Sequence, residues 1–340
     1  MNFILLKEKF RILNKLNIYR LINCILIQTG YFLSYITKKN ITPGFPYAIT
    51  YEPTNFCNLK CPECPTGKGE LKRNKGIASI DRYKNIIDQV KKHTFYLNLY
   101  FQGEPFINPE LYEMIHYASK SKIFTVISTN GHFITEEIAQ KIIKAGLGKI
   151  IFSLDGISQE SYEQYRKGGD FNKVIESIKN LIHKRKELKY SNPVVILQCL
   201  ALASNENYLK EIVKYGKELG VDRVEIKTAQ FYNLDNKENS LVPKMNTYSR
   251  YVKNNIGQWK IKNNLPDKCF LLWSSCVITW DGIVVPCCFD KDAQHSYGKI
   301  DNQNFSKIWK SNKAKKFREM ILKNRKKIDI CNNCTQGLKV

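Results

Sequence analysis

The chain has 340 residues, of which 43% are hydrophobic and 25% charged, and its net charge is +23. This length allows one large domain and a smaller unit, and no repeat or low-complexity tract indicates a fibrous or disordered protein. The excess of Lys and Arg fits an anionic partner, but Lys on solvated surfaces explains it equally well, so we do not expect specific nucleic-acid binding.

Residues 1–45 are predicted to form a basic helical segment. Five Lys or Arg residues fall between Lys7 and Arg20, and an uncharged stretch follows from Leu21 to Thr37. That stretch is too short and too polar for a spanning helix, and it lacks the small-residue cleavage site of a signal peptide. We expect a helix docked on the rest of the protein, with peripheral contact to a membrane surface as the alternative.

Residues 46–230 alternate short β-rich runs with helical patterns, which predicts βα units and a parallel sheet. Helices are expected between the strands, for example from Thr135, a good N-cap, to Ala145, with Gly146 as the stop. Six βα units are two short of a closed barrel, so we expect an α/β fold built as an open, partial (βα)6 TIM-type barrel. The six predicted strands are Tyr47–Glu52, Phe95–Phe101, Phe124–Thr129, Lys149–Leu154, Val194–Ala201 and Arg223–Lys227.

The rest of the chain divides into two parts. Residues 231–264 lose clear periodicity and are predicted to be a linker. Residues 265–340 are too rich in Cys to depend on a hydrophobic core alone, so we expect a small C-terminal domain organised by a metal centre. The basic run from Ser306 to Lys327 predicts a solvated helix, with a docking face for an acidic peptide, a phosphorylated sugar or anionic lipid as the alternative.

Nine of the 11 Cys residues are bunched, which is typical of metal binding and not of a disulfide scaffold. The first group, Cys57, Cys61 and Cys64, follows the first predicted strand. Structural zinc sites take four ligands, whereas three thiolates on a 4Fe-4S cluster leave one iron open to bind a substrate. A zinc-binding loop is the alternative interpretation.

The second group can supply four thiolates, from Cys269, Cys287, Cys331 and Cys334. The sequence from Trp280 to Cys287 predicts a tight hairpin with Asp-Gly at its turn. Taken alone, these four ligands would also suit structural zinc.

The spacing Cys57-x3-Cys61-x2-Cys64 resembles the signature of the radical S-adenosylmethionine (SAM) superfamily. Gly103-Glu104-Pro105 is similar to its GGEP motif, with Gln102 in place of the first Gly, and Glu63 stands where the family often has an aromatic residue near adenine. The resemblance implies that Cys57, Cys61 and Cys64 hold the catalytic cluster. It also implies that SAM is positioned by Gly103, Glu104, Pro105, Asn130, Ser153 and Asp155.

The C-terminal Cys pattern resembles the SPASM or twitch extension of this superfamily. The resemblance implies one auxiliary 4Fe-4S cluster on Cys269, Cys287, Cys331 and Cys334. Two Cys residues are left over, of which Cys276 is the candidate extra ligand and Cys288 is expected to be packed nearby.

The resemblance implies an oxidoreductase or maturase that cleaves SAM to a 5'-deoxyadenosyl radical and oxidises or crosslinks a peptide or small metabolite. It further implies an electron donor such as flavodoxin or ferredoxin, and we expect a cytoplasmic protein. The alternative is a binding or scaffold protein whose Cys sites are purely structural.

Overall fold

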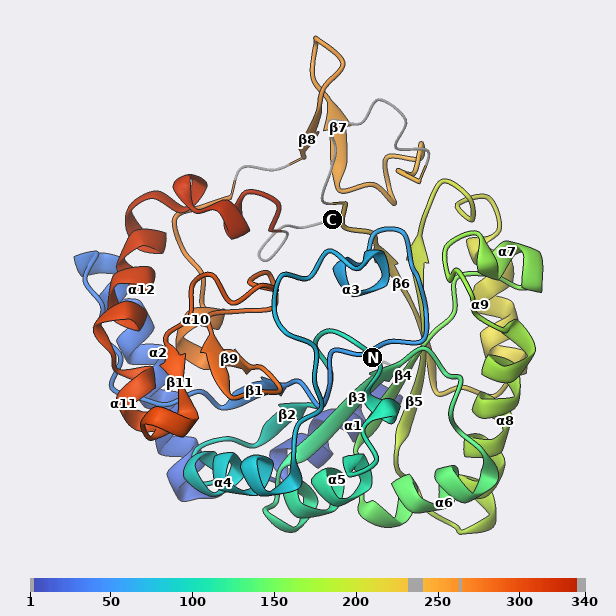
Figure 1. Ribbon diagram of the computed structural model, residues 1–340, viewed down its shortest axis with the longest axis horizontal. Coiled ribbons are helices and arrows are strands. Elements are labelled where there is room, and N and C mark those ends of the chain that lie inside the picture. The colour runs from blue at the N-terminus through green and yellow to red at the C-terminus, as the bar shows by residue number, and fades with distance from the viewer. Residues whose placement is uncertain (1–2, 232–240, 263–264, 335–340) are drawn as a thin grey trace.

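A computed structural model describes residues 3–231, 241–262 and 265–334, and its centre is a curved sheet of nine strands (Figure 1). Six strands in a row pair in parallel, which confirms the predicted partial barrel. Two of them match the predicted bounds at both ends, and the others differ by one to three residues at an end. They are β1 (Ala48–Tyr51), β2 (Tyr96–Asn98), β3 (Phe124–Thr129), β4 (Lys149–Ser153), β5 (Val194–Ala201) and β6 (Arg223–Thr228).

Helices connect these strands and cover the outer face of the sheet (Figure 1). Side chains cap several of them: Ser79, Thr135 and Asp170 each accept a hydrogen bond from a backbone N–H in the first turn. The longer helices turn an apolar side toward the strands, as Met114 and Ile115 of α5 do. The connecting helices are α3 (Pro65–Lys68), α4 (Ile80–Val90), η1 (Pro105–Ile107), α5 (Leu111–Lys120), α6 (Glu136–Ala145), α7 (Gln159–Glu163), α8 (Phe171–Glu187) and α9 (Leu209–Glu218).

The C-terminal part extends the same sheet. Strand β9 (Ser275–Ile278) runs parallel to β1, with Ala48 opposite Ser275 and Ile49 opposite Cys276. It turns back as β10 (Ile283–Val285), so the predicted hairpin is present, and β11 (Gly298–Lys299) forms the edge. The remaining elements pack beside this edge: α10 (Leu271–Ser274), η2 (Ile300–Asn302), α11 (Phe305–Trp309), α12 (Asn312–Asn324), η3 (Arg325–Lys327) and η4 (Asp329–Cys331).

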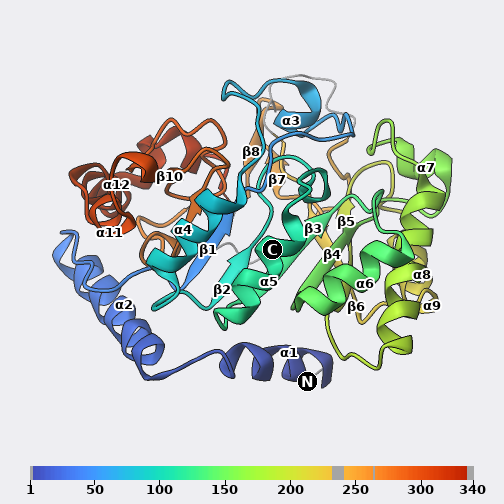
Figure 2. The ribbon, with the colours of Figure 1, turned by 60° about the horizontal axis from the view of Figure 1, so that its bottom comes forward.

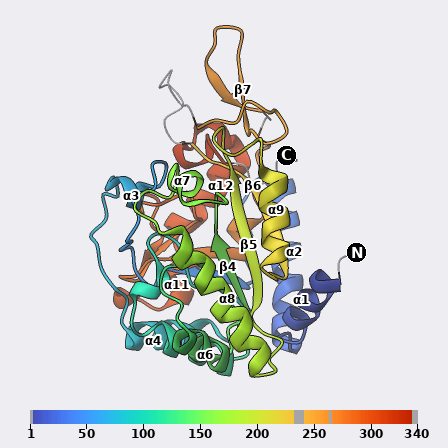
Figure 3. The same ribbon diagram turned by 90° about the vertical axis from the view of Figure 1, so that its right-hand side faces the viewer.

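The predicted linker contains a second, small sheet. Strands β7 (Tyr251–Lys253) and β8 (Trp259–Ile261) pair antiparallel and project from the molecule (Figure 3). Residues 232–240 and 263–264 of that linker lie outside the described residues.

The N-terminal segment forms two helices, α1 (Phe3–Leu13) and α2 (Ile18–Thr37), and both dock on the protein (Figure 2). The carboxylate of Glu8 lies 2.6 Å from Nζ of Lys149, the first residue of β4, and 3.2 Å from a guanidinium nitrogen of Arg223, the first residue of β6. The segment therefore covers the amino ends of the strands. Among the described residues, no helix is both long and apolar enough to cross a bilayer.

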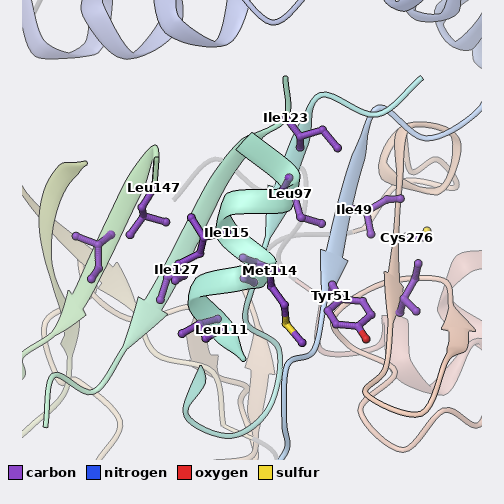
Figure 4. Close-up of a cluster of buried hydrophobic side chains, with 14 of the residues drawn as sticks. Ile49, Tyr51, Leu97, Leu111, Met114, Ile115, Ile123, Ile127, Leu147 and Cys276 are labelled. Carbon is purple, nitrogen blue, oxygen red and sulfur yellow. The ribbon is translucent and has the colours of Figure 1, made fainter. Parts of the chain in front are cut away.

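One large hydrophobic core fills the space between the sheet and its helices. Ile49 and Tyr51 of β1 and Leu97 of β2 are buried in it beside Met114 and Ile115 of α5 (Figure 4). Cys276 of β9 belongs to the same cluster, so the core runs without a break from the barrel into the C-terminal part.

Candidate functional site

The loop that carries Cys57, Cys61 and Cys64 leaves the carboxyl end of β1 and is held by a neighbouring segment. Asn55 exchanges two side-chain hydrogen bonds with that segment, accepting from the N–H of Gly76 at 2.9 Å and donating to the carbonyl of Asn74 at 2.9 Å. Cys61 is buried, while Cys57 and Cys64 are half-buried. All three thiols are therefore fixed at the rim where chemistry occurs in barrels of this type.

Gly103 lets the loop after β2 approach the cysteine loop closely. Its φ is +78°, and a Cβ built there would lie 2.6 Å from the carbonyl oxygen of Phe56. The next residue, Glu104, donates its backbone N–H to the same oxygen at 2.8 Å. Only glycine satisfies both the backbone angle and the contact.

Glu104 is buried at the centre of the rim. Its carboxylate accepts hydrogen bonds from the hydroxyl of Thr129 and the backbone N–H of Asn130, both at 2.7 Å, and from the N–H of Phe106 at 3.3 Å. Burial raises the pKa of Glu104 to about 7, although these three donors act to lower it. A carboxylate held this way offers a buried negative charge to a cationic ligand.

Asn130 links the third strand to the cysteine loop. Its side-chain amide donates to Oδ1 of Asn58 at 2.7 Å and lies 3.9 Å from Sγ of Cys57. Burial raises the pKa of Cys57 to about 11, opposed by the N–H of Leu59. A metal that binds this thiol must displace its proton.

Asp155, at the end of the fourth strand, is tied to the site through a residue that the sequence analysis did not single out. Nε of Arg166 lies 2.6 Å from Oδ2 of Asp155, and Nη1 of Arg166 lies 4.0 Å from Sγ of Cys61. The other carboxylate oxygen of Asp155 accepts from the N–H of Leu200 at 2.6 Å. Arg166 follows the short helix α7, and no local sequence pattern marks it.

The other predicted SAM-contacting residues lie at the same rim. Ser153 ends β4, opposite Gln198 of β5, and Pro105 begins η1. Gln102, which replaces the first Gly of the motif, is buried, and its side chain accepts a hydrogen bond from the hydroxyl of Thr66 at 3.1 Å. That bond joins the loop after β2 to the helix that follows Cys64.

The second cysteine group surrounds one small hollow. It is lined by the thiols of Cys269, Cys287, Cys331 and Cys334, together with that of Cys288 and apolar side chains such as Leu272 and Phe317. Nη2 of Arg325 lies 3.2 Å from Sγ of Cys334. The four predicted ligands therefore come together, although more than 60 residues separate the first from the last.

Cys276 lies elsewhere. It sits on β9 opposite Ile49, is buried within the hydrophobic core (Figure 4), and its pKa is raised to about 12 by burial. Cys288 is the fifth thiol at the hollow and the most exposed of the group.

Lys291 is within electrostatic range of both cysteine groups. Burial lowers its pKa, while Cys64 of the first group and Cys288 of the second raise it. Its backbone carbonyl accepts a hydrogen bond from Nε of Arg73 at 2.5 Å.

The second thiol group surrounds a hollow that suits an iron-sulfur cluster. Within the described ranges, no three His, Cys, Asp or Glu side chains gather closely enough to hold one metal ion. An iron-sulfur cluster has different needs, because each thiolate binds its own iron and the set surrounds a volume instead of a point. The thiol-lined hollow, apolar between its sulfur atoms, fits such a group.

Comparisons with known proteins agree with this geometry. Residues 51–198 match the family model described as the Radical SAM superfamily, and residues 269–335 match that of an iron-sulfur cluster-binding domain, SPASM. The mycofactocin maturase MftC of Mycobacterium tuberculosis is 34% identical over 137 residues, which is 40% of this chain. The match spans only 34% of that maturase.

Two further proteins resemble the chain over most of its length. A Pyrococcus furiosus protein, described as a tungsten-containing aldehyde ferredoxin oxidoreductase cofactor-modifying protein, is 26% identical over 80% of this chain and 83% of its own. The solved structure of Streptococcus suis SuiB bound to its precursor peptide SuiA has a TM-score of 0.62 at 16% identity, covering 85% of this chain and 70% of SuiB. At that identity the likeness establishes the shared fold.

Proposed function

The chain belongs to the radical SAM superfamily and has a C-terminal SPASM iron-sulfur domain, and on that premise we propose that it is a maturase-type oxidoreductase acting on a peptide. The observation that carries the proposal is a pair of polar contact chains at the strand ends. One runs from Cys57 through Asn130 to Glu104, and the other runs from Cys61 through Arg166 to Asp155.

We assign the catalytic 4Fe-4S cluster to Cys57, Cys61 and Cys64. When bound, this cluster supplies one electron to the sulfonium of SAM, which yields a 5'-deoxyadenosyl radical that abstracts hydrogen from the substrate. The chain's own part is to bind and orient. The buried carboxylate of Glu104 suits the methionine ammonium group, and the rim around Asn130, Ser153 and Asp155 would hold the rest of SAM.

We further propose one auxiliary 4Fe-4S cluster on Cys269, Cys287, Cys331 and Cys334. The hollow that these four thiols line supports the assignment, and the place of Cys276 in the core argues against using it as a ligand. Such a cluster would pass an electron to or from the substrate, and flavodoxin or ferredoxin would supply electrons to the catalytic cluster.

A peptide is favoured as substrate over a small metabolite by the relatives. SuiB is solved with a precursor peptide, and MftC is a maturase. One relative is described as a cofactor-modifying protein, so a small-molecule substrate is the alternative. A cytoplasmic location suits a chain that carries so many thiols.

Anaerobic reconstitution with iron and sulfide tests the proposal. We expect about eight irons per chain, the content of two 4Fe-4S clusters, and formation of 5'-deoxyadenosine that depends on reductant. Replacing Cys57, Cys61 and Cys64 with Ala should abolish SAM cleavage and leave about four irons bound. Tightly bound zinc without SAM cleavage would instead establish a binding or scaffold protein with structural Cys sites.

A further inference from the structure

The helices α1 and α2 turn large apolar side chains toward the solvent instead of toward the protein. Strongly exposed side chains on them include Phe10, Leu13, Ile18, Ile25, Phe32 and Ile36, which are 56–63% exposed. Most of the large hydrophobic residues that are exposed in the described part of the chain lie in this one segment. Exposed apolar patches of this kind mark surfaces that bind a protein or a membrane.

The side of α2 that faces the protein carries several polar residues beside the apolar contacts of Ile27 and Tyr31. Its buried residues are Arg20, Asn23, Ile27, Gly30 and Ser34. Arg20 donates to the backbone carbonyls of Lys91 at 2.7 Å and Lys122 at 2.6 Å. Asn23 exchanges two hydrogen bonds of 2.8 Å with the backbone of Phe45. These bonds fix the rotation of α2 and hold its apolar side outward.

The segment that carries this apolar face is strongly cationic. Residues 1–45 contain seven Lys or Arg and a single acidic residue, Glu8, which is buried in ion pairs with Lys149 and Arg223. At the start of α2, Nζ of Lys92 lies 4.9 Å from the ring centre of Tyr19. At its end, Nζ of Lys38 lies 4.5 Å from the ring centre of Tyr35.

This pattern fits a membrane interface. Apolar side chains enter the boundary of the acyl chains, Tyr and Lys lie at headgroup level, and anionic lipids attract the surrounding cations. A second copy of the chain would fit this apolar face less well than a membrane does. A two-fold contact through the face would bring the same lysines together, and their charges would repel.

We propose that α1 and α2 form a peripheral membrane-binding surface that seats on an anionic bilayer without crossing it. The ion pairs of Glu8 place α1 at the amino ends of β4 and β6. The loop of Cys57, Cys61 and Cys64 leaves the carboxyl end of β1 and leads into α3, which lies on the side of the molecule opposite α1, so the first cysteine group faces away from the bilayer (Figure 2). The proposal does not depend on radical chemistry.

Flotation of the full-length protein with lipid vesicles tests it. We expect binding to vesicles of phosphatidylcholine and phosphatidylglycerol, weaker binding to phosphatidylcholine alone, and release as salt is raised. Ile25→Glu combined with Phe32→Glu should weaken binding roughly tenfold or more. Lys38→Glu combined with Lys39→Glu should remove the preference for the anionic lipid.

Ile256→Glu is the matched control, since Ile256 is 76% exposed but lies between β7 and β8. It should bind vesicles like the unmodified protein. All variants should keep the circular dichroism spectrum and the reductant-dependent formation of 5'-deoxyadenosine. The proposal fails if the unmodified protein stays unbound with both vesicles, or if the Ile25/Phe32 variant binds as before. It also fails if that variant only converts a dimer to a monomer, which would identify a second copy as the occupant.

Discussion

Arg166 reaches 2.6 Å from the carboxylate of Asp155, and both side chains are largely withdrawn from water. This pair connects the end of β4 to the thiol of Cys61. Buried ion pairs contribute little net stability when intact, but the loss of one partner leaves an uncompensated charge.

Arg166→Met should therefore lower the free energy of unfolding of the cluster-free protein by about 3 kcal/mol. Adding Asp155→Asn should recover part of that loss, because no buried charge then remains unpaired. Urea denaturation measures both effects. Arg82→Met is the control, since Arg82 pairs with Asp301 on the surface and should cost at most about 1 kcal/mol. Equal losses in the two single variants would contradict the prediction.

Gly103→Ala should prevent assembly of the catalytic cluster. The new Cβ would lie 2.6 Å from the carbonyl oxygen of Phe56, so the cysteine loop would have to move. Gly257→Ala is the control. The φ of Gly257 is +79° and that of Gly103 is +78°, so the backbone strain is matched, but nothing lies within 4 Å of a Cβ added at Gly257. After reconstitution, the iron content should fall by half in Gly103→Ala and stay normal in Gly257→Ala. A normal iron content in Gly103→Ala would refute the steric argument.

The stability of the cluster-free protein should depend on pH through Glu104. Its pKa is raised from 4.5 to about 7 by burial, so the folded state holds this proton more tightly than the unfolded state does. The stabilisation is complete below pH 4.5 and is lost as pH rises to about 7, a change of about 3 kcal/mol. Urea denaturation from pH 4 to pH 8 should show this decline, and Glu104→Gln should flatten it. An unchanged slope in that variant would assign the effect to another group.

Tyr251→Phe should weaken the binding of the auxiliary cluster and leave the catalytic cluster unaffected. The hydroxyl of Tyr251, on β7, donates to Oδ1 of Asn333 at 2.7 Å, and Asn333 lies between Cys331 and Cys334. Losing this hydrogen bond should cost about 1 kcal/mol and speed the release of auxiliary iron to a chelator. Electron paramagnetic resonance would follow the two clusters separately. A faster loss of the catalytic cluster would speak against the prediction.

Cys276→Ala should keep both clusters and lose stability, because Cys276 is packed in the core and does not line the thiol-bounded hollow. Cys331→Ala is its counterpart and should lose the auxiliary iron. If the iron content of the Cys276 variant fell by about half, Cys276 would be a ligand after all.

Much of the barrel could be predicted from the sequence because its signals are local. Thr135 and Gly146 mark the two ends of α6 by capping, and β3 and β5 are rich in β-branched and apolar residues. The cysteine loop and the Gly103–Pro105 motif stand at fixed places after strands, so their meeting at one rim follows from the parallel topology.

Features that depend on distant contacts could not be predicted this way. The pairing of β9 with β1 joins residues more than 200 positions apart, and Arg166 gains its role only because α7 turns it toward Asp155. The sequence favours Cys276 over Cys288 as the extra ligand, but strand register points Cys276 into the core, and Cys288 lines the hollow. Strands β7 and β8 have three residues each, too few for a periodic pattern, so the sequence predicts only a linker there.

The parallel pairing of β1 with β9 also affects how the protein is made. Strand β1 has two neighbours in the finished sheet, β2 and β9, but β9 begins only at Ser275. At roughly 5–20 residues per second, the ribosome needs on the order of ten seconds or more to reach it. During that time one edge of β1 lacks its partner strand, in a chain whose N-terminal helices are already apolar on the outside. The nascent chain thus offers sites for chaperones until its last quarter emerges.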